Sequence, residues 1–161
     1  MKRIFDIIMA IVILTLVLPF GIIISMMILF SSRGGIFYIQ ERVGKDKKPF
    51  GLLKFRTMKQ NADKEGKLTI GMRDGRITKV GYFLRKYKLD EFPQFLNVLK
   101  GDMSVVGPRP EVKEYVDMYT IEQLKILNVR PGITDLASLE YFRENELLGQ
   151  AFKISSGAKV A

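Results

Sequence analysis

An acidic pair, Asp90–Glu91, stands where an apolar helical pattern begins, and it is the first candidate for chemistry in this chain. An aspartate at a helix N-terminus accepts backbone N–H bonds and feels the positive helix end, which favours its ionised form. An ionised carboxylate can attack phosphorus, and the adjacent Glu91 can bind a hard cation such as Mg²⁺. Acidic residues are also common helix caps, so the pair alone does not separate catalysis from capping.

Basic residues that could bind an anion form the second group of candidates. On the strand-like segment 50–58, period-two geometry places Lys54 and Arg56 on one face, about 7 Å apart. Two proline-bounded loops each hold an arginine, and a stiff loop lowers the entropy that a guanidinium loses on binding phosphate. These loops are Val106–Pro110, which contains Arg109, and Arg130–Thr134, which contributes Arg130 and Thr134. The basic strand could equally be an exposed edge that discourages aggregation, and each loop could be a rigid turn with an exposed arginine.

Composition excludes several other chemistries. The chain has 161 residues with no Cys and no His, so a thiolate or imidazole metal site and a Ser-His-Asp relay are excluded. It also contains no G-x-x-x-x-G-K-[ST] or G-x-G-x-x-G fingerprint. The formal net charge of +9 predicts an anionic partner, which could be a nucleic acid, an acidic membrane surface or a phosphorylated substrate.

The N-terminal segment 4–30 is apolar with few interruptions and is typical of a membrane helix. As a straight helix it would be about 40 Å long, against about 30 Å for a bilayer's hydrocarbon core. Pro19 removes a backbone donor near its middle and predicts a kink. Because Lys and Arg flank both ends, a helix broken at Pro19 could enter and leave by the same membrane face. A single-pass helix with a proline kink is the alternative.

Short elements of both kinds are expected in the rest of the chain. Segments 37–42 and 50–58 predict a β-hairpin around a turn that contains Gly, Asp and Pro. Thr78 is placed to cap a helix that runs to about Lys86, and a second helix should begin at or beside Asp90 and end at Gly101. Further helices are expected over residues 114–128 and 136–150.

Taken together, these elements predict an α+β fold that is predominantly helical. The expected parts are a membrane segment at 1–32, a catalytic domain at 33–150 and an atypical tail at 151–161. Basic residues beside apolar helix faces would let the domain lie against an anionic phospholipid surface.

Six sequence blocks, taken in order, resemble the bacterial sugar transferases, which are monotopic phosphoglycosyl transferases. The resemblance covers residues 1 to about 134, and its most specific part runs from Leu89 to Pro110. The blocks are Gln40–Gly44, Lys54–Met58, Leu89–Gln94, Asn97–Ser104, Val106–Pro110 and Arg130–Thr134.

The resemblance implies transfer of a sugar 1-phosphate from a UDP-sugar to polyprenyl phosphate, an early membrane step of glycoconjugate synthesis. The family's Asp-Glu pair matches Asp90 and Glu91. Asp90 would attack the β-phosphorus, forming an aspartyl-phosphosugar and releasing UMP, and Glu91 would hold Mg²⁺. Arg109 would hold phosphate, as the matching family residue does. The remaining substrate-binding candidates, chosen on charge and position, are Lys54, Arg56, Arg130 and Thr134.

The same resemblance implies a location at the cytoplasmic face of the bacterial inner membrane, with a re-entrant helix kinked at Pro19. The expected partners are then a UDP-sugar, polyprenyl phosphate and anionic phospholipid, with no nucleic acid, and a homodimer is an option. The motifs do not encode which sugar is carried.

After Thr134 the sequence departs from the family pattern. Asp135 stands where members usually carry Gly, and the tail has no clear apolar period. Glu140 and Glu144 are one helical turn apart and could replace acidic ligands of the family, although a solvated helix face explains them more simply. Two alternatives stay open: a membrane-anchored basic module that binds acidic lipid or nucleic acid, and a truncated member that keeps the fold without the activity.

Overall fold

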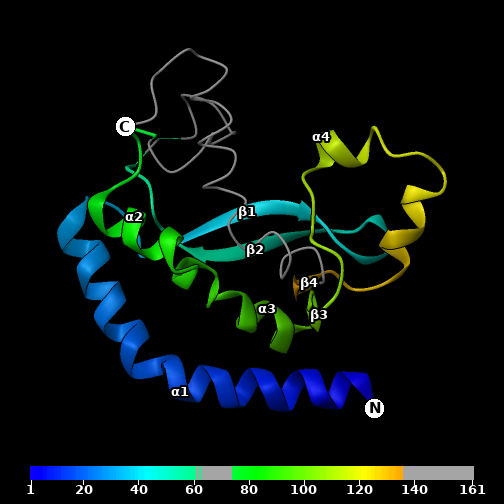
Figure 1. Cartoon of the computed structure of the whole chain (residues 1–161), viewed down its shortest axis with the longest axis horizontal. Helices are drawn as coiled ribbons and strands as arrows, with labels where there is room; N and C mark the ends of the chain where they lie inside the picture. Colours follow the sequence, from blue (N-terminus) through cyan, green and yellow to red (C-terminus); the bar gives the residue numbers. More distant parts are fainter. Residues whose placement is uncertain (61, 63–73, 136–161) are drawn as a thin grey trace, which may run out of the picture.

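The computed structural model describes residues 1–60, 62 and 74–135 and confirms a fold of helices and a small hairpin. The expected helix at 136–150, with Glu140 and Glu144, and the tail at 151–161 lie outside the described residues. Figure 1 shows α1 along one side of the molecule, with α2 and α3 between it and the β1–β2 hairpin. The elements are α1 Lys2–Ser31, β1 Phe37–Val43, η1 Lys45–Lys47, β2 Pro49–Phe55, α2 Lys79–Lys86, η3 Leu89–Glu91, α3 Gln94–Lys100, β3 Ser104–Val106, α4 Lys113–Val116, η4 Gln123–Asn128 and β4 Gly132–Thr134.

Helix α1 is continuous and bent, and Pro19 lies inside it. Figure 1 shows its second half turning away from its first, as expected when a proline removes one i→i−4 hydrogen bond and crowds the preceding turn. Its mean hydropathy is 3.1 over its most apolar window, and among the described residues it is the one helix long and apolar enough to cross a membrane. The predicted kink is therefore present.

The two halves of α1 pack against different parts of one domain. In the first half, Ala10 is fully buried beside Leu52 and Val98. In the second half, Ile24 and Ile28 pack in a cluster with Phe55 and Leu84. The opposite side of the helix exposes large apolar side chains, which include Ile4, Ile8, Val12, Leu16, Phe20, Ile23, Met27 and Phe30. One face of α1 thus belongs to the protein core and the other suits lipid.

Polar contacts tie the start of α1 to the domain. The Arg3 guanidinium donates to the carbonyl oxygens of Val98 and Leu99, at 2.6 and 3.0 Å, near the C-terminal end of α3. Carbonyls in the last turn of a helix lack the usual i+4 amide donor, and the Arg3 guanidinium supplies donors there; the Val98 carbonyl also accepts from the Gly101 N–H at 3.1 Å.

A buried carboxylate ties the same part of α1 to β3. Asp6 is 3% exposed although its helix is apolar. It accepts a hydrogen bond from the Ser104 hydroxyl at 2.9 Å and another from the Val105 N–H at 3.0 Å. A buried carboxylate needs such donors, and their presence explains why Asp6 interrupts the apolar series.

The hairpin and the two predicted helix signals are confirmed. β1 pairs antiparallel with β2, and Phe37 and Phe55 are opposite each other. The Thr78 hydroxyl accepts from the Gly81 N–H at 2.9 Å and caps α2, which ends at Lys86. Gly101 follows α3 with φ 101°, the left-handed conformation that favours glycine after a helix.

A single helix over residues 114–128 was expected, and this prediction is wrong. The structure has the short helix α4, a turn, and then the 3₁₀ helix η4. Between them the Thr120 N–H donates to Gln123 Oε1 at 2.8 Å, and the Gln123 N–H donates to the Thr120 hydroxyl at 3.3 Å. This reciprocal capping box starts a new helical turn and so ends the first one.

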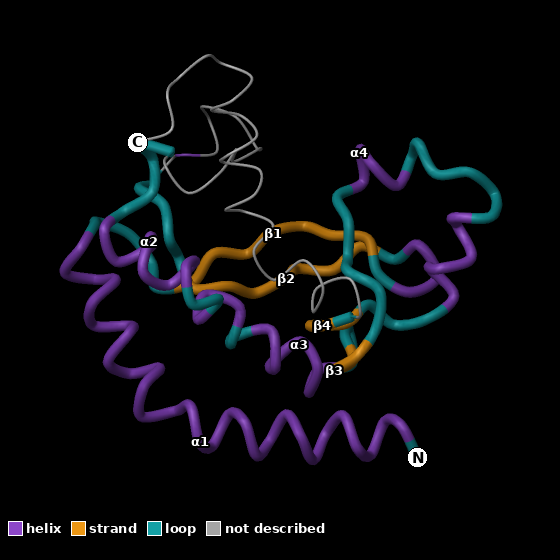
Figure 2. Tube along the Cα trace, viewed as in Figure 1, coloured by secondary structure: helices purple, strands orange, loops and turns teal. Residues whose placement is uncertain are grey.

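A short parallel pair, β3 with β4, was not predicted. Ser104 pairs with Gly132 and Val106 with Thr134. A Cβ built on Gly132 would lie 2.1 Å from the Gly107 backbone nitrogen, so the two chains approach more closely than a side chain would allow. Figure 2 shows the pair as two short strands below the hairpin. The pairing brings the two proline-bounded loops together.

We expect Asp6→Ala to lower the free energy of unfolding by about 2 kcal/mol, because the fully buried Ser104 hydroxyl and the Val105 amide lose their acceptor. Thermal unfolding in detergent micelles measures this. Ile8→Ala, on the exposed side of α1, is the control and should change stability by less than about 0.5 kcal/mol. Equal melting temperatures for the two variants would contradict the prediction.

Candidate active site

Asp90 and Glu91 lie in the 3₁₀ turn η3, between α2 and α3. The turn follows Lys88, whose φ of 54° is left-handed. Asp90 was expected at or beside the N-cap of the next helix, but the N-cap of α3 is Pro93, one turn later. The pair therefore precedes α3 and does not cap it. Glu91 lines a pocket, and its carboxylate forms an ion pair there with Lys54.

Two cations converge on one oxygen of Glu91. Lys54 Nζ donates to Glu91 Oε1 at 3.0 Å, and an Arg109 terminal nitrogen lies 3.7 Å from the same oxygen. Burial pushes the pKa of Glu91 up, but the charges of Lys54 and Arg109 and the Lys54 hydrogen bond outweigh it and hold the pKa below its usual value. Glu91 is therefore an ionised carboxylate at neutral pH.

Burial is the main influence on the pKa of Asp90. Its side chain is 9% exposed, and this burial, with the neighbouring charge of Glu91, raises its pKa above the usual value for aspartate. The positive charges of Lys54 and Arg85 oppose the rise. The sequence predicted the opposite balance, in which a helix end favours the ionised form. The carboxylate of Asp90 interacts with its own backbone N–H, and none of the hydrogen bonds between described side chains involves it.

Arg85 is a site residue that the sequence analysis missed. It comes from the last turn of α2, and its Nε donates to the Thr57 hydroxyl at 2.9 Å, which fixes the guanidinium near Asp90. The sequence signal that could have indicated its role was its position five residues before Asp90, which places it across a short turn from that carboxylate.

The loop that carries Arg109 is fixed to β4 on its N-terminal side. The Gly107 N–H donates to the Thr134 carbonyl at 3.0 Å, and the Gly132 N–H donates to the Pro108 carbonyl at 2.9 Å. These bonds extend the β3–β4 pairing up to the residue before Arg109.

The same loop is fixed to β1 on its C-terminal side. Arg42 donates to the Pro110 carbonyl at 3.1 Å, and the Val43 N–H donates to the Glu111 carbonyl at 2.9 Å. The loop thus connects the hairpin to the β3–β4 pair, with Arg109 between the two points of attachment. The Arg109 side chain is 51% exposed.

A shallow pocket collects these charges. The residues that line it are Arg42, Leu52, Lys54, Glu91, Gln94, Arg109, Pro110, Gly132 and Ile133. Three cations and one carboxylate leave the pocket positive, which suits a polyanion such as a diphosphate.

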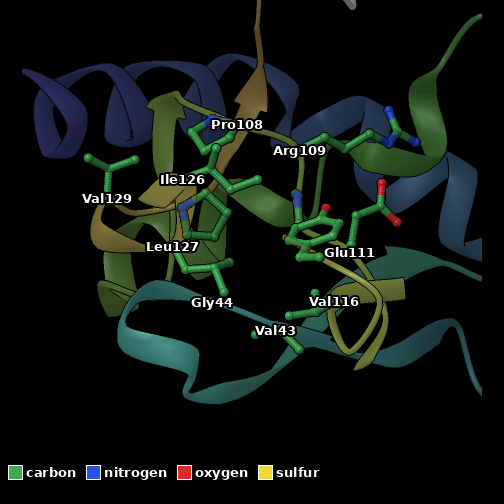
Figure 3. Close-up of a pocket in the computed structure, with 12 residues that line it drawn as sticks. Val43, Gly44, Pro108, Arg109, Glu111, Val116, Ile126, Leu127 and Val129 are labelled. Carbon is green, nitrogen blue, oxygen red and sulfur yellow. The ribbon is translucent and has the colours of Figure 1, made fainter. Parts of the chain in front are cut away.

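A second pocket lies on the other side of the Arg109 loop (Figure 3). Its wall is largely apolar and includes Val43, Val116, Leu127 and Val129. Figure 3 shows the Arg109 side chain extending away from these apolar groups. The loop therefore separates an apolar hollow from the charged pocket.

The structure gathers some of the predicted site residues and not others. Lys54, Glu91 and Arg109 meet, and Asp90 lies beside them. Arg56 instead donates to the Ser32 carbonyl at 2.7 Å, where it ties the end of α1 to β2. Arg130 donates to the Gly101 carbonyl at 2.9 Å, just after α3. Thr134 lies in β4 and serves the site through its backbone carbonyl.

The residues fit Mg²⁺ only together with a phosphate. The described part of the chain has no group of three or more Asp or Glu side chains that could hold a metal ion. Mg²⁺ usually takes one or two carboxylates and completes its shell with substrate phosphates and water. Both cation contacts of Glu91 use Oε1, so Oε2 is the oxygen suited to a metal ion.

The amino-acid sequence matches a known family over nearly all its length. The model of the family described as "Bacterial sugar transferase" matches residues 1–156. The resemblance therefore continues past residue 134, where the motifs alone had placed its end.

Several curated relatives are similar to this chain. A Bacillus subtilis protein named "Putative undecaprenyl-phosphate N-acetylgalactosaminyl 1-phosphate transferase" is 43% identical over 133 residues, which are 83% of this chain and 70% of that protein. An Aeromonas hydrophila UDP-N-acetylgalactosamine-undecaprenyl-phosphate N-acetylgalactosaminephosphotransferase is 40% identical, over 86% of this chain and 33% of its own length. An Escherichia coli UDP-glucose:undecaprenyl-phosphate glucose-1-phosphate transferase is 41% identical, over 89% and 32%. The chain thus spans about a third of the two longer relatives.

We expect Lys54→Met to destabilise the protein in a pH-dependent way. Because the folded-state pKa of Glu91 is depressed, its pairing stabilises the fold above the ordinary pKa of 4.5, and this stabilisation is lost as the pH falls through the folded-state value. Urea unfolding should show a deficit of about 2 kcal/mol at neutral pH that shrinks in acid.

Lys48→Met, in the exposed hairpin turn, is the control for this experiment and should show little deficit at any pH. A deficit in Lys54→Met that is equally large at pH 7 and pH 3 would mean that Lys54 contributes packing and not charge.

Proposed function

The chain belongs to the bacterial sugar transferase family, and on that basis we propose that it transfers a sugar 1-phosphate from a UDP-sugar to polyprenyl phosphate. Its family membership makes it a transferase, and the printed names of its relatives support this class of donor and acceptor. The observation that carries the proposal is the carboxylate of Asp90, which has no ion pair among the described residues, close to a pocket in which Lys54 and Arg109 converge on Glu91.

In the first half reaction, an Asp90 oxygen attacks the β-phosphorus of the UDP-sugar. A bond forms between that oxygen and the β-phosphorus, and the bond from the β-phosphorus to the bridging oxygen breaks. UMP leaves with the bridging oxygen, and the phosphosugar stays on Asp90 as a mixed anhydride. Asp90 is largely buried next to Glu91, which lines the charged pocket, so we infer that the diphosphate approaches from that side.

In the second half reaction, an oxygen of polyprenyl phosphate attacks the same phosphorus. The bond to Asp90 breaks, which restores the carboxylate and gives a polyprenyl diphosphosugar. Both half reactions bring an anion up to another anion, so the main task of the site is to neutralise charge.

The cations of the site supply that neutralisation. Lys54 and Arg109 would hold the diphosphate, and the positive charge of Arg85 favours the charged form of the nucleophile. Mg²⁺ bound through Glu91 would supply further positive charge to the phosphate oxygens and so favour departure of UMP.

The contacts of α1 support a re-entrant helix at the cytoplasmic face of the bacterial inner membrane. Arg3 binds carbonyls at the end of α3, and Ser32 at the other end of α1 accepts from Arg56 of the same domain. A helix that crossed the bilayer would place these two ends on opposite sides of the membrane. Both ends instead make hydrogen bonds to the same domain. The bend at Pro19 would then point into the lipid.

We expect Asp90→Asn to lower release of UMP by at least about a thousandfold, because an amide is a poor nucleophile toward phosphorus. Intact-mass measurement of the wild type mixed with candidate UDP-sugars and Mg²⁺ should show a phosphosugar adduct, which the variant lacks. The matched control is Asp46→Asn in the exposed hairpin turn, which should retain activity. Full turnover by Asp90→Asn would rule out the covalent mechanism, and liposome or DNA binding without turnover would favour a binding module.

Topology has a separate test in this cysteine-free chain. Single cysteines at positions 2 and 33, both exposed, should react with a membrane-impermeant maleimide from the same side of sealed membrane vesicles. Labelling from opposite sides would establish a spanning helix. The homodimer stays a prediction.

A further inference from the structure

Arg42 lines the charged pocket, but its guanidinium is committed to the protein. One terminal nitrogen donates to the Pro110 carbonyl at 3.1 Å and lies 3.4 Å from Glu111 Oε2. The other donates to Gln40 Oε1 at 2.9 Å, and Nε is buried with no hydrogen-bond partner in the described part of the chain. With a side chain 16% exposed, Arg42 has little freedom to turn toward a ligand.

The groups that Arg42 holds directly follow Arg109 in the chain. Together with the Val43 amide, which donates to the Glu111 carbonyl, Arg42 fixes residues 110 and 111 to the end of β1. Arg109 itself is half exposed, and its one described ion contact, with Glu91 at 3.7 Å, is longer than a hydrogen bond. The direction in which Arg109 points therefore depends on how firmly its backbone is held.

Charge adds to this arrangement. Arg42 and Arg109 line the same pocket and carry like charges, whereas Glu111 lies against Arg42. The Arg42–Glu111 pair is close to neutral as a unit, so the charge of Arg109 is left for a ligand. Attraction between Arg109 and Glu91, whose charged atoms lie 3.7 Å apart, favours the side of the pocket where Glu91 lies.

We propose that Arg42 is a positioning residue that aims Arg109 at the phosphates of the donor by fixing the Pro110–Glu111 backbone to β1. The proposal rests on the proposed function, since Arg109 is assigned there to the diphosphate. Arg42 acts through Arg109 and does not itself bind the donor.

A double-mutant cycle tests this assignment. The parent protein is the whole chain with Asp90→Asn, which prevents turnover, and its affinity for UDP is measured by calorimetric titration. Arg42→Gln and Arg109→Gln should each weaken UDP binding about tenfold, and the double variant should be no weaker than Arg109→Gln alone. Arg42→Lys, which keeps the charge but loses the planar fork, should recover only part of the affinity. The matched control is Lys48→Gln from the same hairpin, which should bind UDP as the parent does.

Additive losses in the double variant would overturn the proposal, because they would mean that Arg42 contacts the ligand itself. Unchanged affinity in Arg42→Gln would overturn it as well.

Amide hydrogen exchange provides a readout that needs no ligand. In Arg42→Gln the Val43 N–H should exchange at least about tenfold faster, while the Gly107 N–H, which is bonded to β4, should not change. Unchanged protection at Val43 would overturn the proposal. If the parent protein does not bind UDP at all, the donor assignment in the proposed function fails, and hydrogen exchange still decides whether Arg42 fixes the Arg109 loop.

Discussion

The ion contacts of Glu91 join three segments that are far apart in the sequence. Lys54 comes from the hairpin, Glu91 from the turn before α3, and Arg109 from the loop after β3. A partly buried carboxylate is costly without cations, and two clustered cations repel each other without a carboxylate. The largely buried carboxylate of Glu91 therefore depends most on Lys54, and docking of the hairpin and the Arg109 loop around η3 supplies the cations that it needs.

The surrounding fold serves this constraint with backbone hydrogen bonds more than with a large core. The Arg109 loop is bonded to β4 before the arginine and to β1 after it, and the close approach at Gly107 and Gly132 lets the first of these contacts form. Arg85, fixed by Thr57, adds a positive charge that favours the ionised form of Asp90. Asp90 is thus surrounded by charges whose positions are set by three separate elements.

Local signals in the sequence predicted the parts of the fold that depend on a few neighbouring residues. Thr78 as a cap, Gly101 after a helix and the hairpin turn all follow from such signals. The Thr120–Gln123 capping box was equally local and was overlooked, which produced a false single helix.

Contacts between distant residues were beyond sequence reasoning. The β3–β4 pair joins three-residue strands with no periodicity of their own, and the partners of Arg56 and Arg130 are backbone carbonyls that any sequence offers. Arg56 and Arg130 were placed among the substrate-binding residues on charge and position in the sequence, whereas their contacts in the structure hold the end of α1 and the end of α3. Arg42 and Arg85 were missed for the same reason.

The packing of α1 also bears on how the protein can be prepared. Ala10 in its first half, and Ile24 and Ile28 in its second, complete the two clusters on which β2, α2 and α3 rest. Deleting the helix to obtain a water-soluble fragment would uncover Leu52, Phe55 and Val98 and remove the acceptor for Ser104. The catalytic part and its lipid-facing part share one interior, so extraction with an amphiphile suits this protein better than truncation.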